Sequence, residues 1–193
     1  MKNDIILAGV GGQGILSIAA AIGLAAVNNK LYIKQSEVHG MSQRGGDVQS
    51  HLRISDAPIA SDLIPAGKAD LIISVEPMEA LRYLPWLSAE GWVVTNTVPF
   101  NNIPDYPQTE EILANVKKVK NHIAIDAEAI AKQAGSARAM NIVMLGAASL
   151  FLDIPFERIE EGIRQLFGKK GNDVVELNLK ALRAGREFSE KNR

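Results

Sequence analysis

Short apolar runs that stop at glycine or polar residues predict several buried strands. Residues 4–8 and 69–75 are apolar at almost every position, which is typical of strands covered on both faces. Residues 48–54 alternate between apolar and polar side chains, which indicates a strand with one solvated face. Further strands are predicted at 31–35, 91–97 and 122–125.

Helical segments are predicted between these strands and fill the last third of the chain. Residues 14–28 are small and apolar on every side, so this helix needs cover on more than one face, from this chain or from a partner subunit. Pro77 and Asp126 stand where helices begin. Three more helices are predicted at 137–152, 155–167 and 174–191. Alternating strands and helices favour an α/β fold.

Composition narrows the class of protein. The 193 residues are 47% hydrophobic and 22% charged, which fits one compact domain over residues 1–193. The net charge of −1 lacks the basic excess of a nucleic-acid-binding protein, so no nucleic-acid partner is expected. There is no cysteine, which excludes disulfides, a cysteine nucleophile and cysteine-bound iron–sulfur clusters in this chain.

The pattern near the N-terminus predicts a cytoplasmic protein. Residues 1–4 are too few and too acidic for the charged region of a signal peptide. The uncharged stretch 15–27 is shorter than the roughly 18–20 residues of a membrane span, so no membrane association is expected. The three histidines stand apart in the sequence, and no metal site is predicted.

A glycine motif follows the first predicted strand and opens the first predicted helix. Its candidate cofactor-binding residues are Gly9, Gly11, Gly12, Gln13 and Gly14. The spacing Gly-x-Gly-x-x-Gly lets a phosphate approach the helix N-terminus. Together with the alternation of strands and helices and the helical run after residue 126, it predicts a Rossmann-like, mostly parallel sheet with helices on both faces and a C-terminal helical layer. The glycines could instead serve close packing alone, because Gln13 puts an amide where a phosphate would lie.

A second candidate site lies in the polar segment 37–47, predicted as a loop at the carboxyl end of a strand. Its residues are Glu37, His39, Met41, Ser42, Gln43, Arg44, Gly45 and Gly46. Arg44 with the two glycines suits a carboxylate or phosphate, although a salt bridge between Glu37 and Arg44 is an equal alternative. Secondary candidates are Glu76, Asn96 and Asn141.

The two motifs together resemble the gamma-type subunit of the 2-oxoacid:ferredoxin oxidoreductase family. The resemblance covers nearly the whole chain and includes residues 9–14, 37–46, 74–77 and 178–185 with Asn141. Within the family it is nearest to the branch that takes arylpyruvates such as indolepyruvate.

The resemblance implies a non-autonomous subunit of an oxidoreductase. The family converts a 2-oxoacid and coenzyme A to acyl-CoA and CO2 and passes the electrons to ferredoxin. Thiamine diphosphate and the iron–sulfur clusters would lie in a large catalytic subunit, so this chain would hold no cofactor and no catalytic residue by itself. It would complete the assembly, contribute to the coenzyme A or substrate site, with Arg44 attracting an anionic group, and meet ferredoxin through the complex. The isolated chain is expected to self-associate.

The glycine motif alone supports a different hypothesis, a free-standing NAD- or FAD-binding protein. An acidic residue should then follow about 20 residues later, at the end of the second strand, to bind the ribose. Glu37 lies near that spacing but inside the predicted loop.

Overall fold

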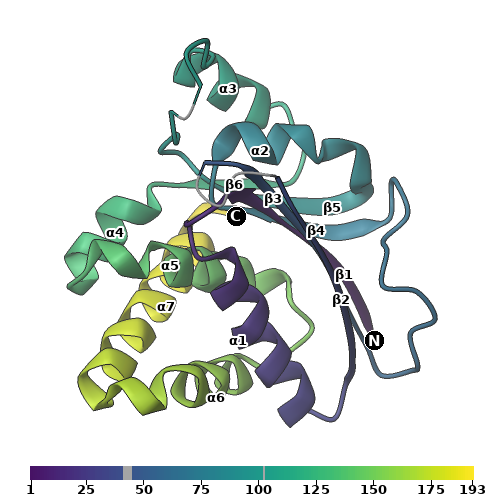
Figure 1. Ribbon diagram of the computed structural model, residues 1–193, viewed down its shortest axis with the longest axis vertical. Coiled ribbons are helices and arrows are strands. Elements are labelled where there is room, and N and C mark those ends of the chain that lie inside the picture. Colours follow the sequence, from purple (N-terminus) through teal and green to yellow (C-terminus); the bar gives the residue numbers. More distant parts are fainter. Residues whose placement is uncertain (41–44, 102) are drawn as a thin grey trace.

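The computed structural model describes residues 1–40, 45–101 and 103–193. These residues form one six-stranded sheet with helices on both faces (Figure 1). The strands are β1 (Lys2–Val10), β2 (Tyr32–His39), β3 (Asp47–Ser55), β4 (Ala69–Ser74), β5 (Leu87–Asn96) and β6 (His122–Ile125).

The strand order is β2-β3-β1-β4-β5-β6. β1, β4, β5 and β6 pair in parallel, which confirms the predicted mostly parallel α/β sheet. β3 runs antiparallel to both β2 and β1, a reversal that the sequence pattern did not indicate. β2 and β3 are joined by a short connection, and short connections join antiparallel strands.

Alternating side chains of β1 divide the buried core between the two faces of the sheet. Ile5 and Leu7 belong to the large core under five helices, whereas Ile6 and Ala8 belong to a smaller core. The five helices are α1 (Ile15–Asn28), α4 (Ala127–Ala134), α5 (Met140–Ala148), α6 (Phe156–Phe167) and α7 (Asn172–Asn192). The opposite face carries α2 (Pro77–Arg82) and α3 (Thr109–Val116), as Figure 1 shows. The predicted C-terminal helical layer is therefore confirmed.

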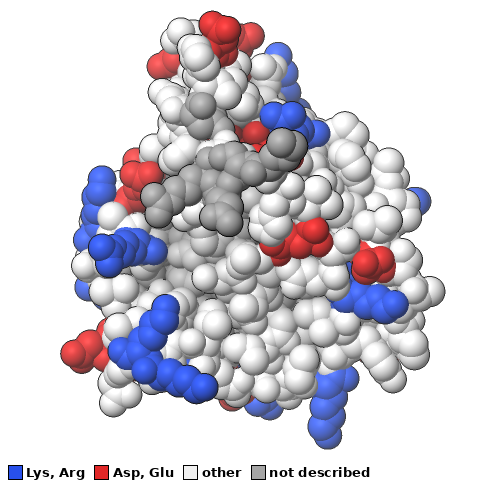
Figure 2. All heavy atoms as spheres, viewed as in Figure 1, with Lys and Arg blue, Asp and Glu red and all other residues white. Residues whose placement is uncertain are grey.

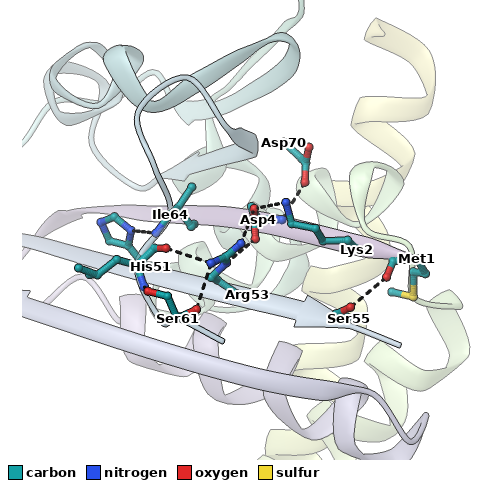
Figure 3. Close-up of polar contacts among 10 residues, drawn as sticks. Met1, Lys2, Asp4, His51, Arg53, Ser55, Ser61, Ile64 and Asp70 are labelled. Atoms are coloured by element: carbon teal, nitrogen blue, oxygen red, sulfur yellow. Dashed lines mark hydrogen bonds and ion pairs between the residues drawn. The ribbon is translucent and has the colours of Figure 1, made fainter. Parts of the chain in front are cut away.

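On the sheet face that carries α2, a buried ion pair helps to hold the segment that follows β3. The carboxylate of Asp4 on β1 is fully buried and accepts two hydrogen bonds from Arg53, at 2.7 and 3.1 Å. The Arg53 guanidinium also donates to the carbonyl of Ser61, and the Ile64 amide donates to the His51 ring (Figure 3). These contacts hold the segment after β3 over β1 and β3.

The outer side of α1 is apolar and uncovered. α6 covers one side of the helix, and a Cβ at Gly162 would lie 2.7 Å from the Ala21 carbonyl oxygen. On the outer side Leu16 and Val27 are 52% and 59% exposed. Figure 2 shows few charged side chains over the middle of α1. The chain thus supplies part of the cover that this apolar helix needs, and the remaining stripe faces outward.

Some predicted boundaries were wrong, and β5 begins at Leu87 instead of residue 91. β2 continues to His39, so Glu37 and His39 are strand residues and not loop residues. Pairing with β3 accounts for this extension, because the polar side chains occupy an edge strand where solvent is accessible. The predicted helix 137–152 is divided into two 3₁₀ turns and α5, and the Ser149 hydroxyl donates to the Gly146 carbonyl where α5 ends. α3 was not predicted.

Candidate functional site

The glycine motif forms the turn from the carboxyl end of β1 into α1. Gly12 and Gly14 have φ angles of 99° and 79°, a conformation that glycine adopts without strain. A Cβ at Gly14 would lie 2.5 Å from the side-chain nitrogen of Asn141, which donates to the Gly14 carbonyl at 3.0 Å. Both backbone conformation and close contact with α5 therefore require glycine at this position.

The Gln13 side chain stabilises this turn through contacts with backbone groups. Its side-chain oxygen accepts from the Val10 amide at 2.8 Å, and its side-chain nitrogen lies 3.5 Å from the Val75 carbonyl oxygen. The amide thus fills the space between the ends of β1 and β4, where a dinucleotide-binding fold would admit a phosphate.

The strand order is a second departure from a dinucleotide-binding fold. There the second strand lies beside the first and presents the acid that binds the ribose. Here β3 separates β2 from β1, and the Glu37 carboxylate pairs with His39 on the same strand. The hypothesis of a free-standing NAD- or FAD-binding protein is therefore not supported.

Two residues of the second predicted site, Gly45 and Gly46, contact the glycine motif. The Gly11 amide donates to the Gly46 carbonyl at 2.8 Å, and the Gly45 amide donates to the Gly11 carbonyl at 3.4 Å. The connection between β2 and β3 is thereby bonded to the start of α1. The predicted residues Met41, Ser42, Gln43 and Arg44 lie outside the described residues.

Two cavities flank the start of α1, and Gly12 and Gly14 line both. The larger, about 570 Å³, lies between the first turns of α1 and α7 and the segment before α5. Its polar lining comprises Gln13, Ser17, Ser136, Arg138, Asn141, Lys170, Asp173 and Asn178. The smaller, about 320 Å³, lies between α1 and the β2–β3 hairpin, and His39 lines it.

The larger cavity suits an anionic ligand. Arg138 and Lys170 bring two positive charges against the single carboxylate of Asp173. The first turn of α1 carries no acidic residue, so its unpaired amides and the positive end of its dipole face the cavity without a neutralising side chain. Arg138 and Lys170 were not predicted as site residues, because neither lies in a recognisable motif.

The predicted residue Glu76 is fully buried and lies just beyond the carboxyl end of β4. One carboxylate oxygen accepts from the Glu79 amide at 2.9 Å and so caps α2. The other accepts from the Tyr106 hydroxyl and from the Phe100 amide. Glu76 thus holds the segment after β5 against the start of α2. Of the three secondary candidates, Asn141 lines the larger cavity.

The predicted residue Asn96 joins β5 to α4. It is fully buried; its side-chain nitrogen donates to the Val98 carbonyl, and its oxygen accepts from the Ala127 amide, each at 3.1 Å. Replacing it with leucine leaves the buried Ala127 amide and the partly buried Val98 carbonyl without these partners. We expect N96L to lower the free energy of unfolding by about 2–4 kcal/mol in urea titration. Asn115, whose side chain donates a solvent-exposed hydrogen bond to the Glu111 carbonyl, is replaced by alanine as the control, and equal losses in the two variants would contradict this role.

The described residues contain neither a cluster suited to a metal ion nor a helix suited to a membrane. Over residues 1–40, 45–101 and 103–193, no three acidic or histidine side chains gather as a metal site would require. In that part of the chain no helix has both the length and the apolar character to cross a bilayer.

Comparison with known sequences gives close relatives over the full chain. The family model for pyruvate ferredoxin/flavodoxin oxidoreductase matches residues 4–188. Indolepyruvate oxidoreductase subunit IorB from Archaeoglobus fulgidus is 40% identical, covering 96% of this chain and 94% of the relative.

Solved structures share the fold. The gamma subunit of a keto/oxoacid ferredoxin oxidoreductase from Geobacter sulfurreducens superposes with a TM-score of 0.72 at 23% identity, over 98% of this chain and 99% of that subunit. A 2-oxoglutarate:ferredoxin oxidoreductase from Magnetococcus marinus, with 2-oxoglutarate, coenzyme A and succinyl-CoA bound, gives 0.78 at 22% identity, and this chain spans 32% of it. With a family match over almost its whole length, the chain belongs to the pyruvate ferredoxin/flavodoxin oxidoreductase family.

Proposed function

We propose that the chain is the small subunit of an arylpyruvate:ferredoxin oxidoreductase, with indolepyruvate as the representative substrate. The reaction joins oxidative decarboxylation of the 2-oxoacid to acyl-CoA formation and to reduction of ferredoxin. The observation that carries this proposal is the 40% identity to an indolepyruvate oxidoreductase subunit over 96% of the chain. All 193 residues would act as one gamma-type domain.

The proposal assigns the redox and decarboxylation chemistry to a large partner subunit. Thiamine diphosphate, when bound there, would stabilise the carbanion left by decarboxylation, and iron–sulfur clusters would carry the electrons to ferredoxin. This chain contains no cysteine that could ligate such a cluster. We expect the uncovered stripe of α1, which includes Leu16 and Val27, to contact that partner, or a second copy when the chain is isolated.

The larger cavity is proposed as this chain's contribution to the coenzyme A site. Coenzyme A carries phosphate groups, and Arg138, Lys170 and the start of α1 offer the charge and amide donors that phosphates bind. Ser17 and Ser136 add hydroxyl groups to the same lining. Arg44 stays a predicted contact to the coenzyme A phosphate or the 2-oxoacid carboxylate. Because ferredoxin and coenzyme A are held inside cells, we propose a cytoplasmic location.

Anaerobic affinity purification of this chain from its native cells tests the proposal. We expect a large partner with bound thiamine diphosphate and iron–sulfur clusters to copurify, and the complex to reduce ferredoxin when indolepyruvate and coenzyme A are added. A chain that is recovered alone under these conditions would contradict the proposal. Pyruvate and 2-oxoglutarate, offered in place of indolepyruvate, show whether the substrate assignment is right.

A further inference from the structure

Two carboxyl groups meet beneath α2, at the base of the connection between β2 and β3. Glu79 on α2 is 3% exposed and accepts from the Arg82 guanidinium at 2.7 and 3.3 Å. Asp47, the first residue of β3, accepts from the Tyr83 hydroxyl at 2.7 Å through one oxygen. Asp47 is near enough to Glu79 to influence its ionisation.

One carboxylate oxygen of this pair lacks a hydrogen-bond donor among the described residues. The second oxygen of Asp47 is buried, and no group in the described part of the chain donates to it. Two ionised carboxylates cannot hydrogen-bond, whereas a proton on Glu79 supplies the missing donor. Burial, reinforced by the neighbouring Asp47, raises the pKa of Glu79 to about 7, and Arg82 opposes this without cancelling it.

Among residues 1–40, 45–101 and 103–193, the other ionisable groups near the pair do not replace that proton. Arg82 is on the solvent side, with its side chain 53% exposed, and its bonds go to Glu79. Tyr83 already donates its hydroxyl hydrogen to Asp47. From the segment after β5, Tyr106 donates to Glu76, which caps α2.

Asp47 connects this pair to the glycine motif. Its carbonyl accepts from the Gly40 amide at 2.8 Å, which closes the base of the β2–β3 connection. The preceding residue, Gly46, accepts from the Gly11 amide at 2.8 Å. A displacement of Asp47 therefore moves the backbone group that Gly11 binds, at the wall of the smaller cavity and next to the larger one.

We propose that Glu79 is a positioning residue, whose protonated carboxyl bonds to Asp47 and thereby holds Gly46 against the glycine motif. When Glu79 loses its proton, the two carboxylates repel each other and the Gly11–Gly46 contact loosens. The ligand site at the start of α1 is then ordered at mildly acidic pH and less ordered at alkaline pH. This inference deepens the proposed function, since it takes coenzyme A as the ligand of that site.

Glutamine at position 79 imitates the protonated carboxyl at every pH, because its amide donates to Asp47 while its oxygen accepts from Arg82. Amide hydrogen exchange of the assembled enzyme, followed in peptides covering 9–14 and 40–47, is compared between wild type and E79Q at each pH from 6 to 8. We expect the wild type to lose about tenfold in protection relative to E79Q across this range. D47N restores a donor from the other side and should remove the same pH dependence, which guards against misfolding of one variant.

The exposed Glu90, paired with Lys120, provides the matched control, and E90Q should behave as wild type. Identical pH dependence of exchange in wild type, E79Q and D47N would overturn the proposal. The KM for coenzyme A, measured in the same pH series, is expected to rise with pH in wild type but not in E79Q. If exchange responds to Glu79 while the KM does not, the positioning role stands and the assignment of coenzyme A to this site fails.

Discussion

Replacing Arg138 and Lys170 together with glutamine is expected to raise the KM for coenzyme A of the assembled enzyme about 10- to 50-fold, with little change in kcat. Both side chains line the larger cavity and supply its positive charge. A charge-assisted hydrogen bond to phosphate is roughly twice as strong as a neutral one, and about 1.4 kcal/mol corresponds to a tenfold change in affinity. The phosphates lie far from the reacting thiol, so the chemical step itself is expected to be unaffected.

The control for this variant removes the same charge elsewhere. Lys169 and Lys180 are exposed and do not line the cavity, so K169Q/K180Q should leave the KM for coenzyme A near the wild-type value. Raising the ionic strength should weaken coenzyme A binding in the wild type and in the control more than in R138Q/K170Q. An unchanged KM in R138Q/K170Q would place coenzyme A outside this cavity.

Gly146→Ala and Gly185→Ala are each expected to lower the free energy of unfolding by about 3 kcal/mol or more, or to prevent folding. α5 and α7 cross at these glycines: a Cβ at Gly146 would lie 1.9 Å from the Leu182 carbonyl oxygen, and one at Gly185 would lie 2.0 Å from the Val143 carbonyl oxygen. The contacted atoms belong to the backbone, so a helix must shift to admit either methyl group. Urea unfolding, or the yield of folded chain, measures the loss.

Gly168 provides the opposite case. Its φ angle is −55°, and a Cβ there would meet no atom within 4 Å. Gly168→Ala should therefore be neutral or stabilise the chain by about 0.4–1 kcal/mol, because alanine has less conformational freedom to lose on folding. If Gly146→Ala and Gly168→Ala had similar effects, the close crossing of α5 and α7 would be contradicted.

The buried strands could be predicted because each contains a short apolar run, and two of them, β1 and β4, lie at the centre of the sheet. The order of the strands could not be predicted in the same way. Residues 48–54 alternate as a strand with one solvated face would. In the structure β3 lies between β2 and β1, and the segment that holds Ser61 and Ile64 covers the polar side chains of His51 and Arg53. The covering segment is held by contacts between residues that are distant in the sequence, and the hydrophobic periodicity of a strand does not predict such contacts.

The candidate site was predictable to the extent that its residues lie in motifs. Gly11 and Gly46 come from the two motifs that the sequence singles out, and one hydrogen bond joins them. Arg138 and Lys170 reach the same place from segments before α5 and α7, far along the chain, and only folding brings them to the start of α1. Asn96 illustrates the opposite error. It is a polar residue at a strand end, but its hydrogen bond to the Ala127 amide stabilises the fold by joining β5 to α4.

Whether the activity requires this chain can be tested by reconstituting the enzyme with and without it. The large subunit, purified anaerobically with its thiamine diphosphate and iron–sulfur clusters, is assayed for reduction of ferredoxin by indolepyruvate and coenzyme A, with and without this chain. We expect ferredoxin reduction to require both chains and to saturate when they are present in equal amounts. Full activity of the large subunit without this chain would contradict its role as a subunit that completes the enzyme.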